Sequence, residues 1–429
     1  MDDPRRATPR TDHVLADPRV REAASRLGPA LVKSVVSTTL ERCRNGAVTP
    51  ADVVDAVLVA LPDAATEMRR VLNATGVVVH TNLGRAPLSE AAVEALGVAA
   101  GATDVELDLD SGRRGRRGRS ALAALAAAVP DAEAVHVVNN GAAALALVTC
   151  ALAAGREVVV SRGEMVEIGD GFRLPELLES VGARLREVGT TNRVRLEDYA
   201  AAVGEDTAFV LKVHPSNFQV TGFTSAVPVR ELAGLPVPVV VDIGSGLLRP
   251  HPRLPDEPSA AAALRAGADL VTASGDKLLG GPQCGLLLGR AELVERLRRH
   301  PLARALRVDK LTLAALEATL VGPTPPVAAA LARPVEELRE RAARLAEAIG
   351  DPARPVESVG VVGGGGAPGV ELPSAAVALP APMALPLRTG ALPVVGRVED
   401  GVLLLDVLAL DPADDDRLAA AVKAALAGG

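Results

Sequence analysis

The feature that most constrains the fold is a regular alternation of short apolar runs with Ala- and Leu-rich helical runs between about residues 73 and 320. Strands that alternate with helices form βαβ units and a mainly parallel sheet. Several of the runs are apolar at every position, as strands covered by helices on both faces require. The sequence therefore predicts an α/β domain on a mainly parallel central sheet. The expected strands are Ala134–Val138, Glu157–Val160, Thr207–Val213, Val237–Ile243, Asp269–Thr272 and Gly285–Leu288.

Two regions with different patterns flank this domain. In Val20–Arg44 the apolar residues recur at helical spacing, and we expect Pro29 to split or kink this helix. Thr49 is a plausible N-cap for a further helix that begins at Pro50. After residue 325 the sequence predicts a small α+β domain. Its expected elements are a helix over Val335–Ile349, a loop over Gly363–Gly366, a strand over Val402–Leu405 and a last helix over about Asp414–Ala427.

These patterns predict three domains. We expect a small N-terminal helical domain over residues 1–65, a large α/β domain over residues 66–325 and a small C-terminal α+β domain over residues 326–429.

Charge and cysteine content exclude several classes of protein. The chain of 429 residues has a formal net charge of −7, and proteins that coat nucleic acid need a positive surface, so we expect no DNA partner. Residues 1–45 differ, with nine Lys or Arg against six Asp or Glu. Three distant cysteines, Cys43, Cys150 and Cys284, indicate neither a disulfide framework nor a metal site. The polar N-terminus and the short apolar runs favour a cytoplasmic protein without a membrane span.

A lysine follows the expected strand Asp269–Thr272 in the sequence Ser274-Gly-Asp-Lys277, with Gly280 and Gly281 behind it. Ligands of open α/β folds bind at the carboxyl edge of the sheet, which Lys277 can reach from such a loop. A lysine that forms a Schiff base with pyridoxal phosphate needs a short loop of small residues. An exposed lysine in a turn is the alternative, and the S-x-x-K pattern alone is a weak signal.

Two further strand ends strengthen the interpretation. Asp242 ends an apolar strand, where it can pair with a protonated pyridine nitrogen, although it can equally cap the turn that follows. Asn140, Gly141 and Ala142 lie between a strand and a helix, where free amides bind phosphate, and Ser274 can add a hydroxyl. An ordinary strand-to-helix turn is the alternative there. The order of phosphate cradle, aspartate and lysine matches the large domain of fold type I pyridoxal phosphate enzymes, the aspartate-aminotransferase type.

Longer stretches of the chain resemble bacterial selenocysteine synthase, from about residue 10 to the C-terminus. The stretches that carry the resemblance are Asn73–Ser89, Ser161–Pro175, Gly189–Arg193, Lys212–Phe218, Asp242–Gly246, Ser274–Gln283 and His300–Lys310.

The resemblance implies a transferase that converts seryl-tRNA(Sec) to selenocysteyl-tRNA(Sec) with selenophosphate, through an aminoacrylyl intermediate on pyridoxal 5′-phosphate. It implies that Lys277 is the Schiff-base lysine, that Arg85, Arg304 and Arg307 bind the phosphate of the selenium donor, and that the enzyme is a homodecamer, a ring of dimers. Guanidinium groups suit phosphate, and the spacing of Arg304 and Arg307 would place both on one face of a helix. The basic N-terminal domain would hold the tRNA.

Some positions stay open. The C-terminal strand of the family usually reads Asp-Leu-Arg-Thr, whereas this chain has Leu408 at the place of the arginine. The run Arg113–Arg119 is either a phosphate-contacting loop or a solvated one. His214 and a residue near Glu164 are candidates to stack on the cofactor ring.

Two other functions compete with this interpretation. A related pyridoxal phosphate lyase that acts on a small phosphorylated amino acid would share the core, because a fold alone does not choose a reaction. Such a lyase does not need the basic N-terminal domain. A catalytically idle tRNA-binding homologue would not need both Lys277 and Asp242.

Overall fold

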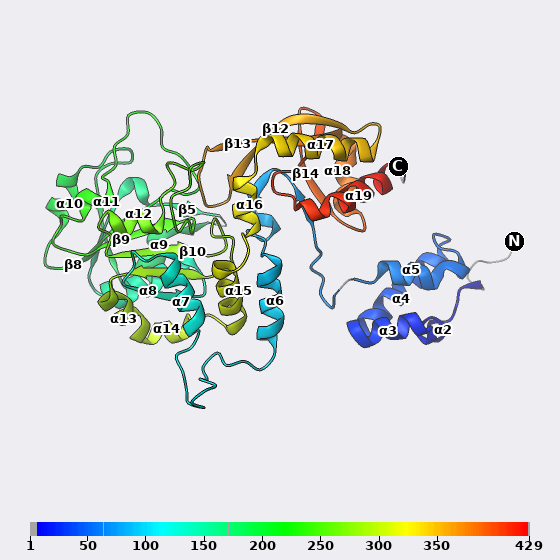
Figure 1. Cartoon of the computed structure of the whole chain (residues 1–429), viewed down its shortest axis with the longest axis horizontal. Coiled ribbons are helices and arrows are strands. Elements are labelled where there is room, and N and C mark those ends of the chain that lie inside the picture. Colours follow the sequence, from blue (N-terminus) through cyan, green and yellow to red (C-terminus); the bar gives the residue numbers. More distant parts are fainter. Residues whose placement is uncertain (1–6, 63, 170, 428–429) are drawn as a thin grey trace. The chain divides into compact units, whose positions relative to one another are not determined.

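The computed structural model describes residues 7–62, 64–169 and 171–427, and the chain divides into two compact units, Met1–Val71 and Leu72–Gly429 (Figure 1). The helical stretch Val20–Arg44 is split at Pro29, as predicted, because one helix ends at Leu27 and the next begins at Pro29. A proline at the first helical position loses no intrahelical hydrogen bond. Asp17 caps the preceding helix by accepting a 2.8 Å hydrogen bond from Arg19 N. The first unit contains α2 (Thr11–Ala16), α3 (Pro18–Leu27), α4 (Pro29–Arg44), the 3-10 helix η1 (Pro50–Asp52) and α5 (Val53–Ala60).

The helices of the first unit pack around an apolar core of their own. Their buried side chains include Val20, Val32, Leu40 and Val53. Residues 1–6, which belong to the basic stretch 1–45, lie outside the described residues.

The second unit contains a seven-stranded sheet in the order β3-β11-β10-β9-β8-β4-β7. All neighbouring strands are parallel except that β11 runs antiparallel to both β3 and β10. The mainly parallel α/β sheet predicted from the sequence is therefore confirmed. Its strands are β3 (Ala134–Val138), β4 (Glu157–Ser161), β7 (Arg184–Val188), β8 (Thr207–Val213), β9 (Val239–Gly244), β10 (Leu270–Ser274) and β11 (Gly285–Gly289).

Helices cover both faces of this sheet, which explains the continuously apolar strands. On β9, Val239 and Val241 pack with one layer of helices, whereas Val240 packs with the other. The first layer consists of α7 (Arg119–Ala128), α10 (Leu196–Ala202), α11 (Val229–Leu232), α12 (Ala260–Arg265) and α15 (Lys310–Val321). The second consists of α8 (Gly141–Ala153), α9 (Leu174–Ser180), α13 (Ala291–Arg299) and α14 (Pro301–Ala305). Helix α6 (Glu90–Ala100) packs against α15, and β5 (Glu167–Ile168) pairs with β6 (Phe172–Arg173).

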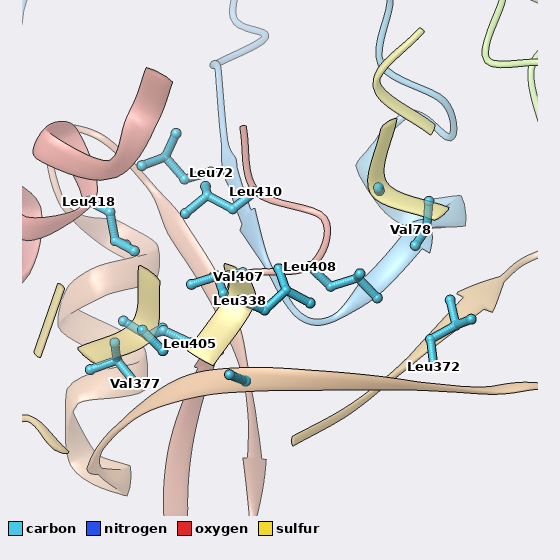
Figure 2. Packing of buried hydrophobic residues seen from close by; sticks show 14 of the residues in the cluster. Leu72, Val78, Leu338, Leu372, Val377, Leu405, Val407, Leu408, Leu410 and Leu418 are labelled. Carbon is cyan, nitrogen blue, oxygen red and sulfur yellow. The ribbon is translucent and has the colours of Figure 1, made fainter. Parts of the chain in front are cut away.

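A second, six-stranded sheet has the order β1-β14-β15-β13-β12-β2. Its core joins this sheet to α17 and α19, and Figure 2 shows Leu338 and Leu418 of these helices beside Val377 and Leu405 of the strands. The strands are β1 (Leu72–Ala74), β2 (Val77–Val79), β12 (Arg354–Gly363), β13 (Glu371–Pro380), β14 (Val394–Glu399) and β15 (Val402–Asp406). The helices are α16 (Pro326–Ala332), α17 (Val335–Ile349), α18 (Ala384–Thr389) and α19 (Asp415–Ala427).

The position of β1 and β2 differs from the expected domain boundaries. The expected large domain, residues 66–325, includes both strands, but β1 pairs with β14 and β2 pairs with β12. Residues 72–79 therefore belong to the C-terminal sheet. Strands β1 and β2 have only three residues each, and their partner strands lie far along the chain. The local sequence therefore does not reveal which sheet they join.

Candidate active site

Lys277 lies in the turn that follows β10, at the carboxyl edge of the large sheet. Its side chain packs against the glycine-rich loop that follows β12, where a Cβ atom added to Gly365 would lie 2.6 Å from Lys277 Nζ. A Cβ atom added to Gly244, the last residue of β9, would lie 3.9 Å from the same nitrogen. The amine therefore lies between the end of β9 and a loop of the C-terminal sheet.

Asp242 lies on β9, directly beside the strand that leads to Lys277. Its Oδ1 accepts hydrogen bonds from Thr272 Oγ1 at 2.8 Å and from Gly244 N at 3.3 Å. Burial raises the pKa of the Asp242 carboxyl, and the hydrogen bond from Thr272 and the charge of Lys277 oppose that shift. A protonated ring nitrogen bound beside this carboxyl would compensate its buried charge.

Burial also changes the charge of the lysine. It lowers the pKa of the Lys277 ammonium, the carboxylate of Asp242 opposes this shift, and the guanidinium of Arg85 adds to it. The neutral amine is the form that adds to an aldehyde, so this environment favours the reactive state of Lys277.

The N-terminus of α8 lies beside the lysine turn and forms a cradle without bulky side chains. Asn140 Oδ1 caps the helix by accepting a 2.7 Å hydrogen bond from Ala143 N. A Cβ atom added to Gly141 would lie only 2.5 Å from Ser274 Oγ, so the serine hydroxyl occupies the space beside the first helical residue. The amides of Gly141 and Ala142 and this hydroxyl are a donor set that fits a phosphate group. The side-chain oxygen of Asn140 serves as the N-cap of the helix and accepts from Ala143 N.

His214 follows β8 and is held by a glutamate that the sequence analysis did not identify. His214 Nε2 lies 3.1 Å from Glu257 Oε2, and the backbone N of His214 donates to Asp242 O at 2.9 Å. Glu257 Oε2 also accepts a 2.6 Å hydrogen bond from Ala367 N in the loop of the C-terminal sheet. Glu257 therefore connects the histidine to the loop that contacts Lys277. It lies in a segment without a strand or motif, so no local signal indicates this position.

Of the three arginines expected to bind the selenium donor, Arg85 lies beside the turn that contains Lys277. Its Nη1 forms a 2.7 Å ion pair with Asp276 Oδ2, and its φ of 68° lies in the left-handed region. The backbone N of Ala86 donates to Asp276 O, so the two segments are fixed together. A strained non-glycine residue beside a candidate site fits a functional constraint.

Arg304 and Arg307 do not share a helix, so that part of the sequence interpretation is wrong. Helix α14 ends at Ala305, and Arg307 forms an isolated β-bridge with Val138 at the end of β3. Asp309 is the N-cap of the next helix, so Arg307 lies in the short segment between two helices and does not continue the helical spacing of Arg304. Both arginines are exposed, and Arg307 lies 3.5 Å from Glu106.

The run Arg113–Arg119 is part of a loop that its own arginines stabilise. Arg114 and Arg117 both pair with Glu106 at 3.1 Å, and Arg119 Nη1 donates to Leu107 O. Three arginines of the run therefore hold the loop together through these contacts. Arg113 and Arg116 are exposed.

The residues at this edge fit pyridoxal phosphate by the chemistry of their side chains. The amine of Lys277, the buried carboxyl of Asp242 and the N-terminus of α8 lie on neighbouring elements, as the cofactor's aldehyde, ring nitrogen and phosphate require. Within residues 7–62, 64–169 and 171–427, no cluster of three or more His, Cys, Asp or Glu could hold a metal ion. In the same ranges, no helix has the length and apolar content to cross a membrane.

Comparison with known proteins decides the family. A family described as L-seryl-tRNA selenium transferase matches residues 71–411, and one described as selenocysteine synthase N terminal matches residues 5–44. The chain belongs to the L-seryl-tRNA selenium transferase family.

Relatives in this family match over nearly the whole chain. The L-seryl-tRNA(Sec) selenium transferase of Moorella thermoacetica is 43% identical, over 99% of this chain and 97% of the relative. The enzyme of the same name from Desulfomicrobium baculatum is 44% identical, over 98% of this chain and 99% of the relative. The chain is therefore a transferase.

A solved structure shares the fold at lower identity. D-glucosaminate-6-phosphate ammonia-lyase aligns with a TM-score of 0.60 and 20% identity, over 84% of this chain and 96% of that chain. This likeness supports the α/β fold and does not bear on the reaction.

Proposed function

We propose that this chain converts seryl-tRNA(Sec) to selenocysteyl-tRNA(Sec), using selenophosphate as the selenium donor and pyridoxal 5′-phosphate as the cofactor. The observation that carries the proposal is the meeting of Lys277, Asp242 and the N-terminus of α8 at one sheet edge, in a chain of this family. The idle homologue is disfavoured because both ionisable groups are present and both have pKa values changed by burial.

Each of these groups has a role toward the cofactor. The amides of Gly141 and Ala142 and the hydroxyl of Ser274 would bind its phosphate, and Lys277 Nζ would be the amine that holds it covalently. Asp242 would keep a proton on the ring nitrogen. When bound, the cofactor supplies an electron-accepting ring that stabilises negative charge at the Cα atom of serine. His214, held by Glu257, would lie against the cofactor ring.

Lys277 also serves as the general base. Once the substrate amine has taken its place, its neutral Nζ can accept the Cα proton, because burial lowers its pKa toward the working range. The β-hydroxyl of serine would leave as water, and the selenium of selenophosphate would form a bond to the β-carbon. Hydrolysis would break the bond between selenium and phosphorus and release inorganic phosphate, and Lys277 would return the proton to the Cα atom.

Arginines bind the selenium donor in this proposal. Arg85 is held beside the lysine turn by Asp276, where its side chain is 39% exposed and its guanidinium can still bind a phosphate. Arg304 and Arg307 would act from the end of α14 and the segment behind it. Their exposure leaves them accessible to an anion.

The N-terminal unit is proposed as the tRNA-binding domain. Its helices expose Lys33, Arg42 and Arg44, and it contains the basic stretch 1–45 of an acidic chain. Phosphate contacts release counterions, so its affinity for tRNA should fall steeply with salt. Cytoplasmic location follows from the proposed substrate, since charged tRNA is found there.

We also propose a homo-oligomer, with a ring of dimers as its form. Val98 of α6 is 75% exposed and Val321 of α15 is 68% exposed, and these two helices pack together. A second copy of the chain would remove these side chains from water. Sedimentation of the purified protein measures its mass, and a monomer would contradict this part of the proposal.

The experiment that tests the function is incubation of the protein with cofactor, seryl-tRNA(Sec) and selenophosphate, followed by mass analysis of the esterified amino acid. We expect selenocysteine. Seryl-tRNA(Ser) is the matched control, and unchanged serine on tRNA(Sec) would overturn the proposal.

A further inference from the structure

Glu257 brings a buried carboxylate to the candidate site from the segment between β9 and α12. Its side chain is 0% exposed, and its backbone N donates to Leu254 O at 3.2 Å, which fixes the segment. Oε2 accepts from Ala367 N at 2.6 Å and lies 3.1 Å from His214 Nε2. Oε1 is buried and has no hydrogen-bond partner among the described residues. Because a buried oxygen without a donor is costly, this atom indicates that a donor reaches it during the reaction.

The residue that donates to Glu257 has a strained backbone. Ala367 has a φ of 45°, in the left-handed region that favours glycine. A non-glycine residue keeps this conformation only where its surroundings enforce it, and such residues cluster at functional sites. Ala367 follows Gly365 by two residues, and a Cβ atom added to Gly365 would lie 2.6 Å from Lys277 Nζ. The same short loop therefore contacts the carboxylate of Glu257 and the amine of Lys277.

Three carboxylates act on the charge of Lys277. Burial lowers the pKa of the Lys277 ammonium, and the guanidinium of Arg85 lowers it further. The carboxylates of Asp242, Asp276 and Glu257 oppose this change. Asp276 is paired with Arg85 at 2.7 Å, and Asp242 is the partner that the ring nitrogen of the cofactor requires. Glu257 is the one of the three that keeps a buried oxygen without a partner in the described part of the chain.

We infer that Glu257 is a positioning residue for the proton transfer, with Oε1 as the hydrogen-bond acceptor for the ammonium of Lys277. The inference rests on the proposed function. The Cα–H bond of serine breaks, its electron pair stays on the substrate, and the proton forms a new N–H bond on Lys277 Nζ. This step creates a positive charge where burial already disfavours it. Oε1 is ready to accept from this ammonium, because Oε2 of the same carboxylate is already held by Ala367 and His214.

The first measurement is competitive labelling of the lysines by acetic anhydride in the full-length, cofactor-free protein. The chain contains only five lysines, so mass spectrometry can follow each one in its own peptide. Acetic anhydride reacts with the neutral amine, and the labelling at pH 7 therefore reports the neutral fraction. Glu257→Gln removes the charge and keeps an oxygen that can accept from Ala367 N. Labelling of Lys277 should rise about 10-fold, as expected when a neighbouring opposite charge is lost.

Three controls separate this effect from damage to the fold. Lys212 is paired with Glu164 and its side chain is 17% exposed, so its labelling should stay unchanged while the protein is folded. Asp269→Asn removes a buried carboxylate that directly precedes β10, at the end of the strand opposite to Lys277, and should leave the labelling of Lys277 unchanged. Glu257→Asp keeps the charge and should label Lys277 as the original protein does.

The second measurement is the pH dependence of kcat for the formation of selenocysteyl-tRNA(Sec). The charge of Glu257 raises the pKa of the Lys277 ammonium, so Glu257→Gln should move the acid limb of the profile to lower pH. The maximal kcat should fall about 10-fold, because the ammonium that forms is stabilised less. The KM for seryl-tRNA(Sec) should stay unchanged, because Glu257 acts through Lys277.

Unchanged labelling of Lys277 in Glu257→Gln would overturn the inference. A fall in kcat without a shift of the acid limb would also overturn it and leave Glu257 a purely structural role. If Lys212 gains label in parallel, Glu257→Gln has unfolded and Glu257→Asp decides, since increased labelling of Lys277 in that variant would contradict a role for the charge. Failure of the unaltered protein to form product would refute the proposed function, whereas the labelling result does not depend on it.

Discussion

Replacing Gly365 by alanine tests whether the glycine-rich loop positions Lys277. Gly365 has a φ of +91°, and an added Cβ atom would lie 2.6 Å from Lys277 Nζ and 2.7 Å from its Cδ. A side chain at positive φ costs about 1–2 kcal/mol. Moving the lysine out of the way into a strained rotamer adds about 0.5–1.5 kcal/mol. We therefore expect the free energy of unfolding of the cofactor-free protein to fall by about 1.5–3.5 kcal/mol.

Gly401→Ala is the matched control for the backbone term. Gly401 has a φ of +76° and no atom within 4 Å of an added Cβ, so this variant carries only the backbone cost. Urea unfolding of both variants gives the difference between them, and repeating the pair in a Lys277→Ala background should remove it, as a double-mutant cycle requires. Cofactor uptake, followed by absorbance, should slow in Gly365→Ala alone, since a displacement of about 1 Å can cost about 100-fold in rate.

The reasoning would be refuted by equal stability losses for Gly365→Ala and Gly401→Ala in both backgrounds together with unchanged cofactor uptake. That result would mean that the loop passes the lysine without constraining it.

Three further predictions concern the candidate site itself. Lys277→Ala should abolish covalent attachment of the cofactor after borohydride treatment, measured by the mass of the intact protein; attachment at another residue would contradict the assignment. Because burial raises the pKa of the Asp242 carboxyl, protonation stabilises the folded state below about pH 4 and this contribution is lost as the pH rises through the raised value. Asp242→Asn should therefore raise the Tm of the cofactor-free protein at neutral pH while removing transferase activity, and a lowered Tm would oppose the burial argument. Arg304→Ala should raise the concentration of selenophosphate needed for half-maximal rate and leave the cofactor absorbance unchanged, whereas loss of cofactor would give this arginine a different role.

The large sheet could be predicted from the sequence because its central strands are apolar on both faces. Thr207–Val213 and Val239–Gly244 fall at or near the predicted runs. Strand β7 was missed because it lies at the edge of the sheet and reads Arg-Leu-Arg-Glu-Val, with most of these residues partly or fully exposed. Period and polarity identify buried strands, and an edge strand has neither signal.

The C-terminal sheet was mostly hidden for a different reason. Strands β12 and β13 contain Pro355, Pro373 and Gly360, which are breaker residues in a local reading. Only Val402–Asp406 has the plain apolar pattern of a strand. Pairing along most of the length of β12 and β13 compensates for these residues, and such long-range pairing is not visible in sequence.

The candidate site shows the same division between local and distant contacts. Lys277, Asp242 and Gly141 each follow or end a strand, so topology alone brings them to one edge. Glu257 and Gly365 reach that edge from segments without regular structure or from the other sheet. A sequence pattern can identify residues that lie at the end of a strand. It cannot identify residues that only tertiary packing places at the edge of the sheet.

Leu408 shows how this chain does without an arginine at a position where its family usually has one. Asp406, the buried end of β15, accepts hydrogen bonds from Ser374 Oγ at 2.7 Å, Ser358 Oγ at 2.6 Å and Arg397 Nη1 at 3.1 Å. The charge of this buried carboxylate is therefore compensated from the neighbouring strand β14, which removes one electrostatic need for a cation two residues further along.

The packing around Leu408 agrees with this account. The side chain is fully buried in the core of the C-terminal sheet (Figure 2). A Cβ atom on Gly360 would lie 2.4 Å from Leu408 Cδ2. Leu408→Arg would therefore bury an unpaired charge beside Gly360. Because Arg397 already serves Asp406, the substitution would gain no partner there. The leucine is thus matched to its own core, and the cation that balances Asp406 comes from Arg397 on the neighbouring strand.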